Sequence, residues 1–397
     1  MTHDTDIPQG YKATALGVIP QKWEVKFLGD LLSRCTNGLT YDVSITCGIP
    51  VTRIETISTG EINYAKVGYI PNESGYETFR MQKGDILYSH INSLSQIGKV
   101  AYYKGDKEIY HGMNLLLLRA NNCLDKQYLY YTLLTEHMRH MAQIIAKPAV
   151  NQASISTSDL KRVKIAVPPL AEQRKIAEVL GVWDEAIEKQ ARLIEKLALR
   201  KRGLMQRLLS AKLRLPGFSD PWKELKINKI TIIRKGEQVN KDVLFSNAKY
   251  PVINEGITPS GYLDIYNTKA NTITISEGGN SCGYVNFMTT PFWSGGHCYT
   301  IEAKDGINNL CIYQLLKNNE KYIMSLRVGS GLPNIQIKDL GNLKFMIPTY
   351  QEQTAIAEVL TASDREIELA KEKLERLRRQ KRGLMQQLLT GKKRVKY

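Results

Sequence analysis

Apolar residues recur in alternating steps of four and three along two stretches of the chain, residues 172–209 and 352–389. This spacing predicts two amphipathic helices, each with a single apolar stripe. Each would be about 57 Å long at 1.5 Å per residue. One stripe cannot be buried alone, so we expect the two helices to pair. The expected pairing residues are Ile176, Leu180, Trp183, Ile187, Ile194, Leu197, Leu204 and Leu208 in the first stretch and Ile356, Leu360, Ile367, Ala370, Leu374, Leu377, Leu384 and Leu388 in the second.

The two stretches are also copies of one another. At a constant shift of 180 residues and without a gap, 20 of their 38 aligned positions are identical. Lys201 and Lys381 interrupt the two stripes at the same position, and Gly203 and Gly383 follow them. A polar residue in such a stripe sets register, and a glycine within a helix costs about 1 kcal/mol relative to alanine. The repeated Lys-Arg-Gly therefore suggests close approach of another group.

Each predicted helix is preceded by a region of short alternating runs separated by Asn, Gly and Ser, the pattern of strands and turns. A helix is then expected over residues 125–145 in the first region and over residues 307–326 in the second. The regions follow one plan, although their sequences have diverged. The runs expected to form strands are residues 49–57, 60–70, 84–91, 97–103 and 114–120 in the first region, and residues 250–257 and 282–288 in the second.

These elements predict an α+β protein in which two globular, β-rich domains with helices alternate with two long helices. We expect the helices to pair as an antiparallel intramolecular coiled coil, which would relate the domains by an approximate twofold axis. A Pro/Gly segment at residues 214–222 separates the halves. The predicted parts are recognition domain 1 (1–164), helix 1 (165–214), recognition domain 2 (215–344) and helix 2 (345–397).

Charge narrows the choice of partner. The chain has 55 Lys and Arg against 39 Asp and Glu, a net charge of +16. The helical segments are the densest, with 11 basic against 6 acidic residues in 165–214 and 12 against 7 in 345–397. An excess of this size indicates a polyanionic partner, with nucleic acid ahead of an acidic protein surface.

Several kinds of chemistry are not indicated. The six cysteines show no C-x-x-C spacing, and no phosphate-binding loop, dinucleotide fingerprint or metalloprotease motif occurs. We therefore expect no catalytic residue, no metal site and no cofactor on this chain. The longest strictly apolar run is Leu115–Leu118, too short to span a membrane, and no signal sequence opens the chain. These features favour a soluble cytoplasmic protein.

Two related but different domains held apart by a basic helical spacer suit a protein that reads two different half-sites of duplex DNA. Lysine and arginine would contact phosphates, and polar loop side chains would contact base edges in the major groove. A turn-forming or packing role is the alternative for each loop residue. The candidates are Arg53, His90, Asn92, Ser93, Gln96, Lys99, Lys147, Asn151 and Gln152 in the first domain, and Asn280, Ser281, Tyr284, Arg327, Ser330 and Asn334 in the second, where Glu277 lies on the same loop.

The helix openings carry a family resemblance. PPLAEQRKIAEVL at residues 168–180, PTYQEQTAIAEVL at residues 348–360 and the twice-used KRGLMQ-x-LL resemble the specificity subunit of type I restriction–modification systems over essentially the whole chain. The resemblance implies a non-enzymatic subunit that recognises a bipartite, asymmetric DNA sequence. It also implies two methyltransferase subunits, which bind S-adenosylmethionine, and two restriction subunits, which use ATP and magnesium. The expected role is phage defence and DNA methylation.

Other interpretations remain open at this point. A recognition subunit of a related modification or phage-exclusion system would keep the fold and change the partners. A free-standing DNA-binding regulator is disfavoured because no helix-turn-helix pattern is present. A coiled-coil scaffold without a DNA role would make the basic charge incidental. The recognised bases and the spacer length cannot be derived from one sequence, because loop contacts and DNA shape set them.

Overall fold

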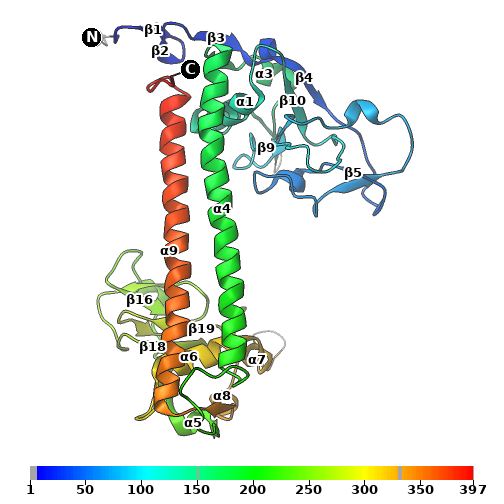
Figure 1. The fold of residues 1–397 in the computed structure, drawn as a ribbon. Helices are drawn as coiled ribbons and strands as arrows, with labels where there is room; N and C mark the ends of the chain where they lie inside the picture. The colour runs from blue at the N-terminus through cyan, green and yellow to red at the C-terminus, as the bar shows by residue number, and fades with distance from the viewer. Residues whose placement is uncertain (1–6, 150–151, 330–332, 397) are drawn as a thin grey trace. The chain divides into compact units, whose positions relative to one another are not determined.

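A computed structural model describes residues 7–149, 152–329 and 333–396 (Figure 1). The chain divides into two compact units. Unit 1 comprises Met1–Lys189 together with Leu374–Tyr397, and unit 2 comprises Gln190–Lys373. Each unit therefore contains one globule of sheets and short helices and a part of each long helix.

The long helices are α4 (Leu170–Leu208) and α9 (Tyr350–Leu388), each 39 residues long and unbroken (Figure 1). Each begins directly after a proline-containing segment. Before α4, Pro169 O accepts hydrogen bonds from Glu172 N and Gln173 N at 2.9 and 3.0 Å, and before α9, Thr349 O accepts from Gln353 N at 2.9 Å. Three residues after the end of each helix, one residue adopts a left-handed conformation, Ala211 with φ 58° and Gly391 with φ 73°. The repeat in the sequence thus fixes the start, the length and the end of both helices.

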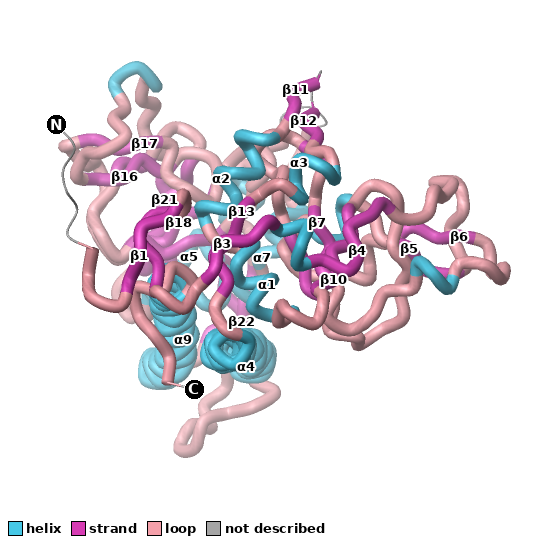
Figure 2. The backbone as a smooth tube through the Cα atoms, turned by 90° about the horizontal axis from the view of Figure 1, so that it is seen from above, coloured by secondary structure: helices cyan, strands magenta, loops and turns pink. Residues whose placement is uncertain are grey.

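The core of unit 1 is built on a four-stranded antiparallel sheet of order β4-β10-β7-β9, and Figure 2 shows β4, β7 and β10 side by side. Along the chain, helices α1 and α2 follow β10. Helix α3 then precedes β13, which pairs with β3, and α4 begins after β13. Smaller sheets β1-β2, β5-β6 and β11-β12-β8 complete the globule. The bounds are β1 (Tyr11–Thr14), β2 (Gly17–Pro20), β3 (Glu24–Phe27), β4 (Leu32–Asn37), β5 (Ile49–Val51), β6 (Gly68–Ile70), β7 (Ile86–Tyr88), β8 (Ile91–Asn92), β9 (Val100–Tyr102), β10 (Leu116–Ala120), α1 (Lys126–Leu133), α2 (Glu136–Ile145), β11 (Lys147–Ala149), β12 (Gln152–Ser154), α3 (Thr157–Lys161) and β13 (Lys164–Val167).

Unit 2 repeats this plan with a four-stranded sheet of order β15-β21-β18-β19 and a β14-β22 pair before α9. A second sheet has the order β17-β16-β20. The order along the chain makes β15, β18, β19 and β21 the counterparts of β4, β7, β9 and β10. The bounds are β14 (Lys223–Lys226), α5 (Ile227–Ile230), β15 (Thr231–Lys235), β16 (Tyr250–Ile253), β17 (Gly261–Leu263), β18 (Thr272–Ser276), β19 (Val285–Met288), β20 (Trp293–Ser294), β21 (Cys298–Ala303), α6 (Asn309–Asn318), α7 (Glu320–Ser325), α8 (Ile337–Gly341) and β22 (Lys344–Ile347).

Some elements expected from the sequence are shorter or divided. The helix expected over 125–145 is two helices, because the side chain of Thr135 caps α2 by accepting a hydrogen bond from Met138 N. The strand expected over 49–57 ends at Val51, and a 3-10 turn (Ile54–Ile57) follows in which the Thr56 hydroxyl accepts from Arg53 N. Within 60–70 only β6 is a strand. The helix expected over 307–326 breaks at Asn319.

The apolar stripes of the long helices are shared between helix pairing and the globule cores. In unit 1, Ile176 and Leu180 of α4 lie in one buried cluster with Trp23 and Tyr128 of the globule and Leu388 of α9. A second cluster in unit 2 joins Leu208 of α4 and Ile356 and Leu360 of α9 to Ile227 and Ile312. Each globule is therefore attached to both helices through one continuous core.

Candidate DNA-recognition loops and the helical spacer

In unit 1 the structure joins the two loops that carry most of the candidate DNA contacts. Strand β8, in the loop after β7, pairs antiparallel with β12 of the late loop, with Ala153 opposite Asn92 and Ser154 opposite Ile91. This pairing is continued by Ile155 N, which donates to His90 O at 2.8 Å. Residues about 60 positions apart in the sequence thus form one polar surface.

The candidate side chains on this surface differ in availability. Ser93 and Gln152 are exposed, and Gln96 is half-buried. Asn92 donates through Nδ2 to Ser89 Oγ at 3.1 Å, and its Oδ1 accepts from Ser93 N at 2.8 Å. Asn151 lies outside the described residues.

The basic candidates of unit 1 have protein partners. The Lys99 ammonium donates to Ser58 O at 2.7 Å, and the ammonium of Lys147, which is 76% exposed, lies 3.6 Å from a carboxylate oxygen of Asp159. Arg53 lies apart from the paired loops in the chain, at the start of the 3-10 turn after β5, with Nε 3.5 Å from a Glu55 oxygen. These contacts orient the cationic groups without burying those of Lys147 and Lys99.

His90 lies directly beneath the loop surface and is only 5% exposed. Its Nε2 is 3.1 Å from Asn37 Nδ2. Burial lowers the pKa of His90 to about 4, against the opposing effect of the Tyr88 backbone carbonyl. The ring is therefore neutral near pH 7 and is poorly placed for direct contact with DNA.

Unit 2 joins its two loops in the same way. Gly278 and Val328 both form β-bridges with Asn334, and Ile335 N donates to Glu277 O at 2.9 Å. Asn280, Arg327 and Asn334 are exposed and Ser281 is half-buried, whereas Ser330 lies outside the described residues. One face of the Tyr284 ring is already occupied, with Lys317 Nζ 4.3 Å from the ring centroid.

Asn37, Lys235 and Tyr299 also lie beside the recognition loops, although no sequence pattern singles them out. Asn37 and Lys235 end the edge strands β4 and β15, and Tyr299 lies on the inner strand β21, so only the sheet order places these residues beside the loops. Lys235 Nζ and the Tyr299 hydroxyl each donate to Glu277 Oε1, at 2.7 and 2.9 Å. A signal for such residues would require the strand register, which short, diverged strands do not reveal.

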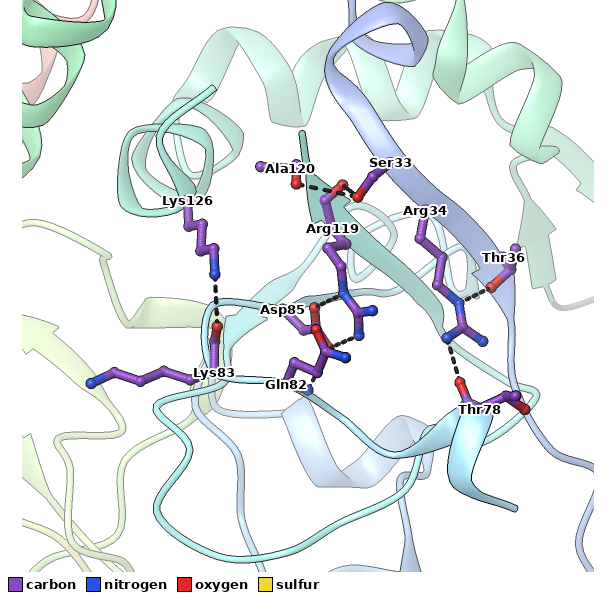
Figure 3. A network of polar contacts seen from close by, with 10 residues as sticks. All are labelled: Ser33, Arg34, Thr36, Thr78, Gln82, Lys83, Asp85, Arg119, Ala120 and Lys126. Carbon is purple, nitrogen blue, oxygen red and sulfur yellow. Dashed lines mark hydrogen bonds and ion pairs between the residues drawn. The ribbon is translucent and has the colours of Figure 1, made fainter. Parts of the chain in front are cut away.

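The sheet of unit 1 is braced by a buried ion pair at the start of β7, the end of that strand away from the recognition loop (Figure 3). Arg119 of β10 binds Asp85 through two hydrogen bonds of 2.7 and 2.8 Å, and Asp85 is 1% exposed. Asp85 also accepts from Gln82 N at 2.7 Å. On β4, Arg34 Nε donates to Thr36 Oγ1 at 3.1 Å, and its guanidinium also contacts Thr78 O. The Arg119–Asp85 ion pair ties the start of β7 to β10 and so holds the strand that leads into the recognition loop.

All the residues expected to pair the helices are buried or half-buried. Most of the buried members lie near the helix ends, where the globule cores cover them. In the middle of the pair, Leu197, Ala370 and Leu374 are also buried, beside half-buried side chains and polar contacts. The buried members are Ile176, Leu180, Leu197, Leu208, Ile356, Leu360, Ala370, Leu374 and Leu388, and the half-buried members are Trp183, Ile187, Ile194, Leu204, Ile367, Leu377 and Leu384.

The Glu-Gln pair that opens each long helix has a defined structural role. In unit 1, Glu172 is 1% exposed and accepts from Trp23 Nε1 at 3.1 Å and from Arg394, which follows α9, at 2.5 and 2.8 Å. Gln173 donates to Pro168 O at 2.9 Å and accepts from Asp125 N at 2.8 Å. The helix start is thereby fixed to its own globule and to the end of the other helix.

Unit 2 contains the same arrangement. Glu352 is also 1% exposed and accepts from Trp222 Nε1 at 3.0 Å and from Arg214, which follows α4, at 2.6 and 2.8 Å. Gln353 donates to Pro348 O at 2.9 Å and accepts from Asn308 N at 2.8 Å. Because the start of one helix meets the end of the other within each unit, the helices run antiparallel.

The lysines within the apolar stripes are paired with aspartates of the other helix. Lys381 Nζ lies 2.5 Å from Asp184 Oδ1 in unit 1, and Lys201 Nζ lies 2.5 Å from Asp364 Oδ1 in unit 2. Both lysine side chains are 12% exposed. A nearly buried charge that must find one partner penalises shifted pairings, which is how such residues set register.

The glycines two positions after these lysines are not required by any contact within the described structure. A Cβ atom built on Gly203 or Gly383 would meet no described atom within 4 Å. The close approach expected from the repeated Lys-Arg-Gly is therefore not an approach between the two helices.

Within residues 7–149, 152–329 and 333–396, no group of three or more His, Cys, Asp or Glu side chains could hold a metal ion. All six cysteines are free thiols. No helix in the same described ranges is long and apolar enough to cross a membrane.

The chain thus has two related but non-identical loop surfaces, and each lies on a globule that packs on the antiparallel long helices. This arrangement defines a class of two-domain recognition proteins. A family model described as the type I restriction modification DNA specificity domain matches residues 20–198 and 219–379. The chain belongs to this family. It is a type I restriction–modification specificity subunit with two target-recognition domains, a non-catalytic, DNA-recognition component.

The similarity to known proteins covers nearly the whole chain. The chain is 35% identical to a protein of Methanocaldococcus jannaschii named as the specificity subunit of the type I restriction enzyme MjaX, over 98% of this chain and 97% of that protein. It is 24% identical to the MjaVIII specificity subunit of the same organism, over 95% and 94%. The crystal structure of a type I restriction–modification S subunit from M. genitalium matches the fold with a TM-score of 0.64 at 22% identity, covering 92% of this chain and 96% of that one.

Proposed function

We propose that the two units read the two halves of one asymmetric, bipartite site in duplex DNA, one unit for each half. The observation that supports this most strongly is the contrast between the helical spacer and the loops. The spacer repeats the same contacts in both units, whereas the joined loops carry different side chains at corresponding places. Two units with the same helix contacts but different loop side chains suit two half-sites that differ in sequence.

The side chains available on the loops fit base and phosphate recognition. Exposed Ser93 and Gln152 in unit 1 and Asn280 and Asn334 in unit 2 are donors and acceptors for base edges. Lys147 and Arg327 are exposed cations suited to phosphates. Asn92, Gln96 and Lys99, with Arg53, Ser281 and Tyr284, would line the edges of these surfaces, and Asn151 and Ser330 belong to the same loops in the sequence.

The length of the DNA gap between the two half-sites would be set by the long helices. A continuous helix of 39 residues is about 58 Å long at 1.5 Å per residue. We assign sequence reading to the two recognition domains proposed from the sequence, 1–164 and 215–344. The proposed helices, 165–214 and 345–397, would set the distance between the two half-sites.

We further propose that two methyltransferase subunits and two restriction subunits assemble on this chain. S-adenosylmethionine, ATP and magnesium would then be bound by those partners. The exposed helix faces around Gly203 and Gly383 suit the docking of a partner, because open space surrounds both positions. Because the proposed target is cellular DNA, we also propose a cytoplasmic location.

Methylome sequencing of a host strain with and without the gene tests the proposal. We expect a single bipartite motif, with a fixed gap between its halves, to lose adenine methylation on deletion of the gene. Methylation that is unchanged, or a lost motif with only one continuous block, would contradict the proposal.

A further inference from the structure

The residues that follow β7 and β18 occupy equivalent positions in the two units. Ser89 and His90 follow β7, and Ser276, the last residue of β18, is followed by Glu277. Gly98 N donates to Ser89 O and Gly283 N donates to Ser276 O, each at 2.8 Å. The late loop joins one residue further on in both units, with Ile155 N and Ile335 N donating to the carbonyl oxygens of His90 and Glu277. His90 and Glu277 are therefore structural counterparts.

Their side-chain partners are counterparts as well. Asn37 is the last residue of β4 and lies opposite Leu116, which in turn lies opposite Tyr88 of β7. Lys235 is the last residue of β15 and lies opposite Tyr299, which lies opposite Ile275 of β18. In each unit the end of the outer strand thus reaches across to the start of the recognition loop.

The two pairs differ in charge. In unit 1, Asn37 Nδ2 donates to His90 Nε2 at 3.1 Å and to Met113 O at 3.0 Å, and the neutral ring makes this an uncharged pair. In unit 2, Lys235 Nζ lies 2.7 Å from Glu277 Oε1. Burial alone would raise the pKa of Glu277, but hydrogen bonds from Lys235 and Tyr299 outweigh it and lower the pKa, so this pair is ionic.

Glu277 is the more heavily connected of the two. It is 8% exposed, and besides Lys235 it meets the Tyr299 hydroxyl at 2.9 Å and His297 Nδ1 at 3.4 Å. The Tyr299 hydroxyl also lies 3.0 Å from Ile335 O, and Cys282 Sγ donates to Glu277 O at 3.0 Å. Glu277 thereby connects the first loop and the late loop through its backbone carbonyl, and the end of β15 and Tyr299 through its carboxylate.

We propose that the pairs Asn37–His90 and Lys235–Glu277 are positioning residues for sequence recognition, one pair for each half-site. The proposal rests on the proposed function. His90 and Glu277 are too buried to contact bases, but Asn92 and Ser93 follow the first and Asn280 and Ser281 follow the second. Each pair also fixes the loop that presents Gln152 or Asn334. A shift of either loop moves base-contacting groups out of hydrogen-bond geometry, which is demanding in distance and angle.

The test uses the full chain assembled with the methyltransferase subunits proposed above, and selects bound sites from a pool of randomised duplex DNA. The unit 2 variant is Glu277→Gln, which keeps the shape and removes the charge. The control is Glu302→Gln, which removes an exposed ion pair, Arg234 to Glu302 at 2.8 Å, from the neighbouring strands of the same sheet.

For Glu277→Gln we expect base discrimination within one half-site to fall by about tenfold, or about 1.4 kcal/mol, with discrimination at the other half and the gap unchanged. Glu302→Gln should leave both halves unchanged. In unit 1, His90→Ala should broaden the opposite half-site alone. Lys235→Arg, which keeps the charge and alters its geometry, replaces Glu277→Gln if that variant lowers the melting temperature by more than a few degrees.

Three results overturn the proposal: unchanged base preferences in the folded variants, an equal loss at both halves, or a uniform loss of affinity with the preferences intact. The last result would assign the pairs to stability alone. Failure of the proposed function is distinguishable, because the unsubstituted complex would then select no bipartite sequence at all.

Discussion

The guanidinium of Arg394 binds the carboxylate of Glu172 across 222 residues of sequence, with hydrogen bonds of 2.5 and 2.8 Å. Arg214 binds Glu352 in the same way in unit 2. Each carboxylate is buried and also accepts from a tryptophan of its own globule. Each unit is thus completed by a segment that follows the other unit's recognition domain in the chain.

Removing one of these carboxylates should destabilise its unit. In Glu172→Gln the Arg394 guanidinium loses its ionic partner, and since breaking a buried pair costs about 3–5 kcal/mol while Arg394 is 33% exposed, we expect a loss of about 2–3 kcal/mol. Chemical denaturation measures it. Glu178→Gln is the control, because Glu178 is exposed on the same helix, where it forms an ion pair with Lys175. Equal stability of the two variants would contradict this role.

The middle of the helix pair should depend on its buried leucines. Leu197 is 7% exposed, whereas Leu199 on the same helix is 65% exposed. Leu197→Asp places a carboxylate in the pair and should cost more than about 3 kcal/mol, and combining it with Leu377→Asp should disrupt the pairing further. Leu199→Asp should change the melting temperature by little. If both aspartates have the same effect in thermal denaturation, the observed helix packing is wrong.

Replacing Gly203 and Gly383 by alanine should raise the stability of the chain and weaken its binding to partner subunits. Since alanine is favoured over glycine within a helix by about 1 kcal/mol and a Cβ meets no described atom at either position, Gly203→Ala with Gly383→Ala should stabilise the isolated chain.

If the open faces receive methyltransferase subunits, the same double variant should weaken their binding at least about tenfold in a titration. The control is Gly181→Ala, also within α4, where a Cβ would make only ordinary contact with Tyr131 at 3.9 Å. It should leave assembly unchanged. Undiminished binding by the double variant would remove these faces from the proposed interface.

Exchange of one recognition domain should alter one half-site. Residues 23–163 lie within unit 1 and end just before β13, which enters α4. Replacing them with the corresponding domain of another specificity subunit should change the bases of one half and keep both the other half and the gap, as read by methylome sequencing. A change in both halves would show that the units do not read DNA independently.

Acid should destabilise unit 1 through its buried histidines. Burial lowers the pKa of both His90 and His111 to about 4, below the ordinary value of 6.5. The unfolded chain therefore binds more protons between those values, and stability falls as pH decreases through that range. From pH 7 to 5 we expect a loss of about 2 kcal/mol for each histidine.

Denaturation of the full chain at several pH values measures this slope. His90→Gln should reduce it, whereas His140→Gln, at an exposed position of α2, should not. A slope unaffected by His90→Gln would contradict the role of His90 burial.

The sequence by itself determined the two long helices, because a heptad pattern and its repeat are local and regular. It also indicated the alternation of globules and helices, the absence of catalytic motifs and the family. The Glu-Gln openings were recognisable as a motif, although their partners were not.

Only the tertiary structure decided which residues meet. Asn37 and His90 are 53 positions apart, and Lys235 and Glu277 are 42 apart; strand register brings each pair together. Short strands of three to six residues carry too little periodic signal to fix that register. The same limit explains why His90 was expected at the DNA surface, whereas the sheet places it beneath the loop: exposure depends on what packs over a residue.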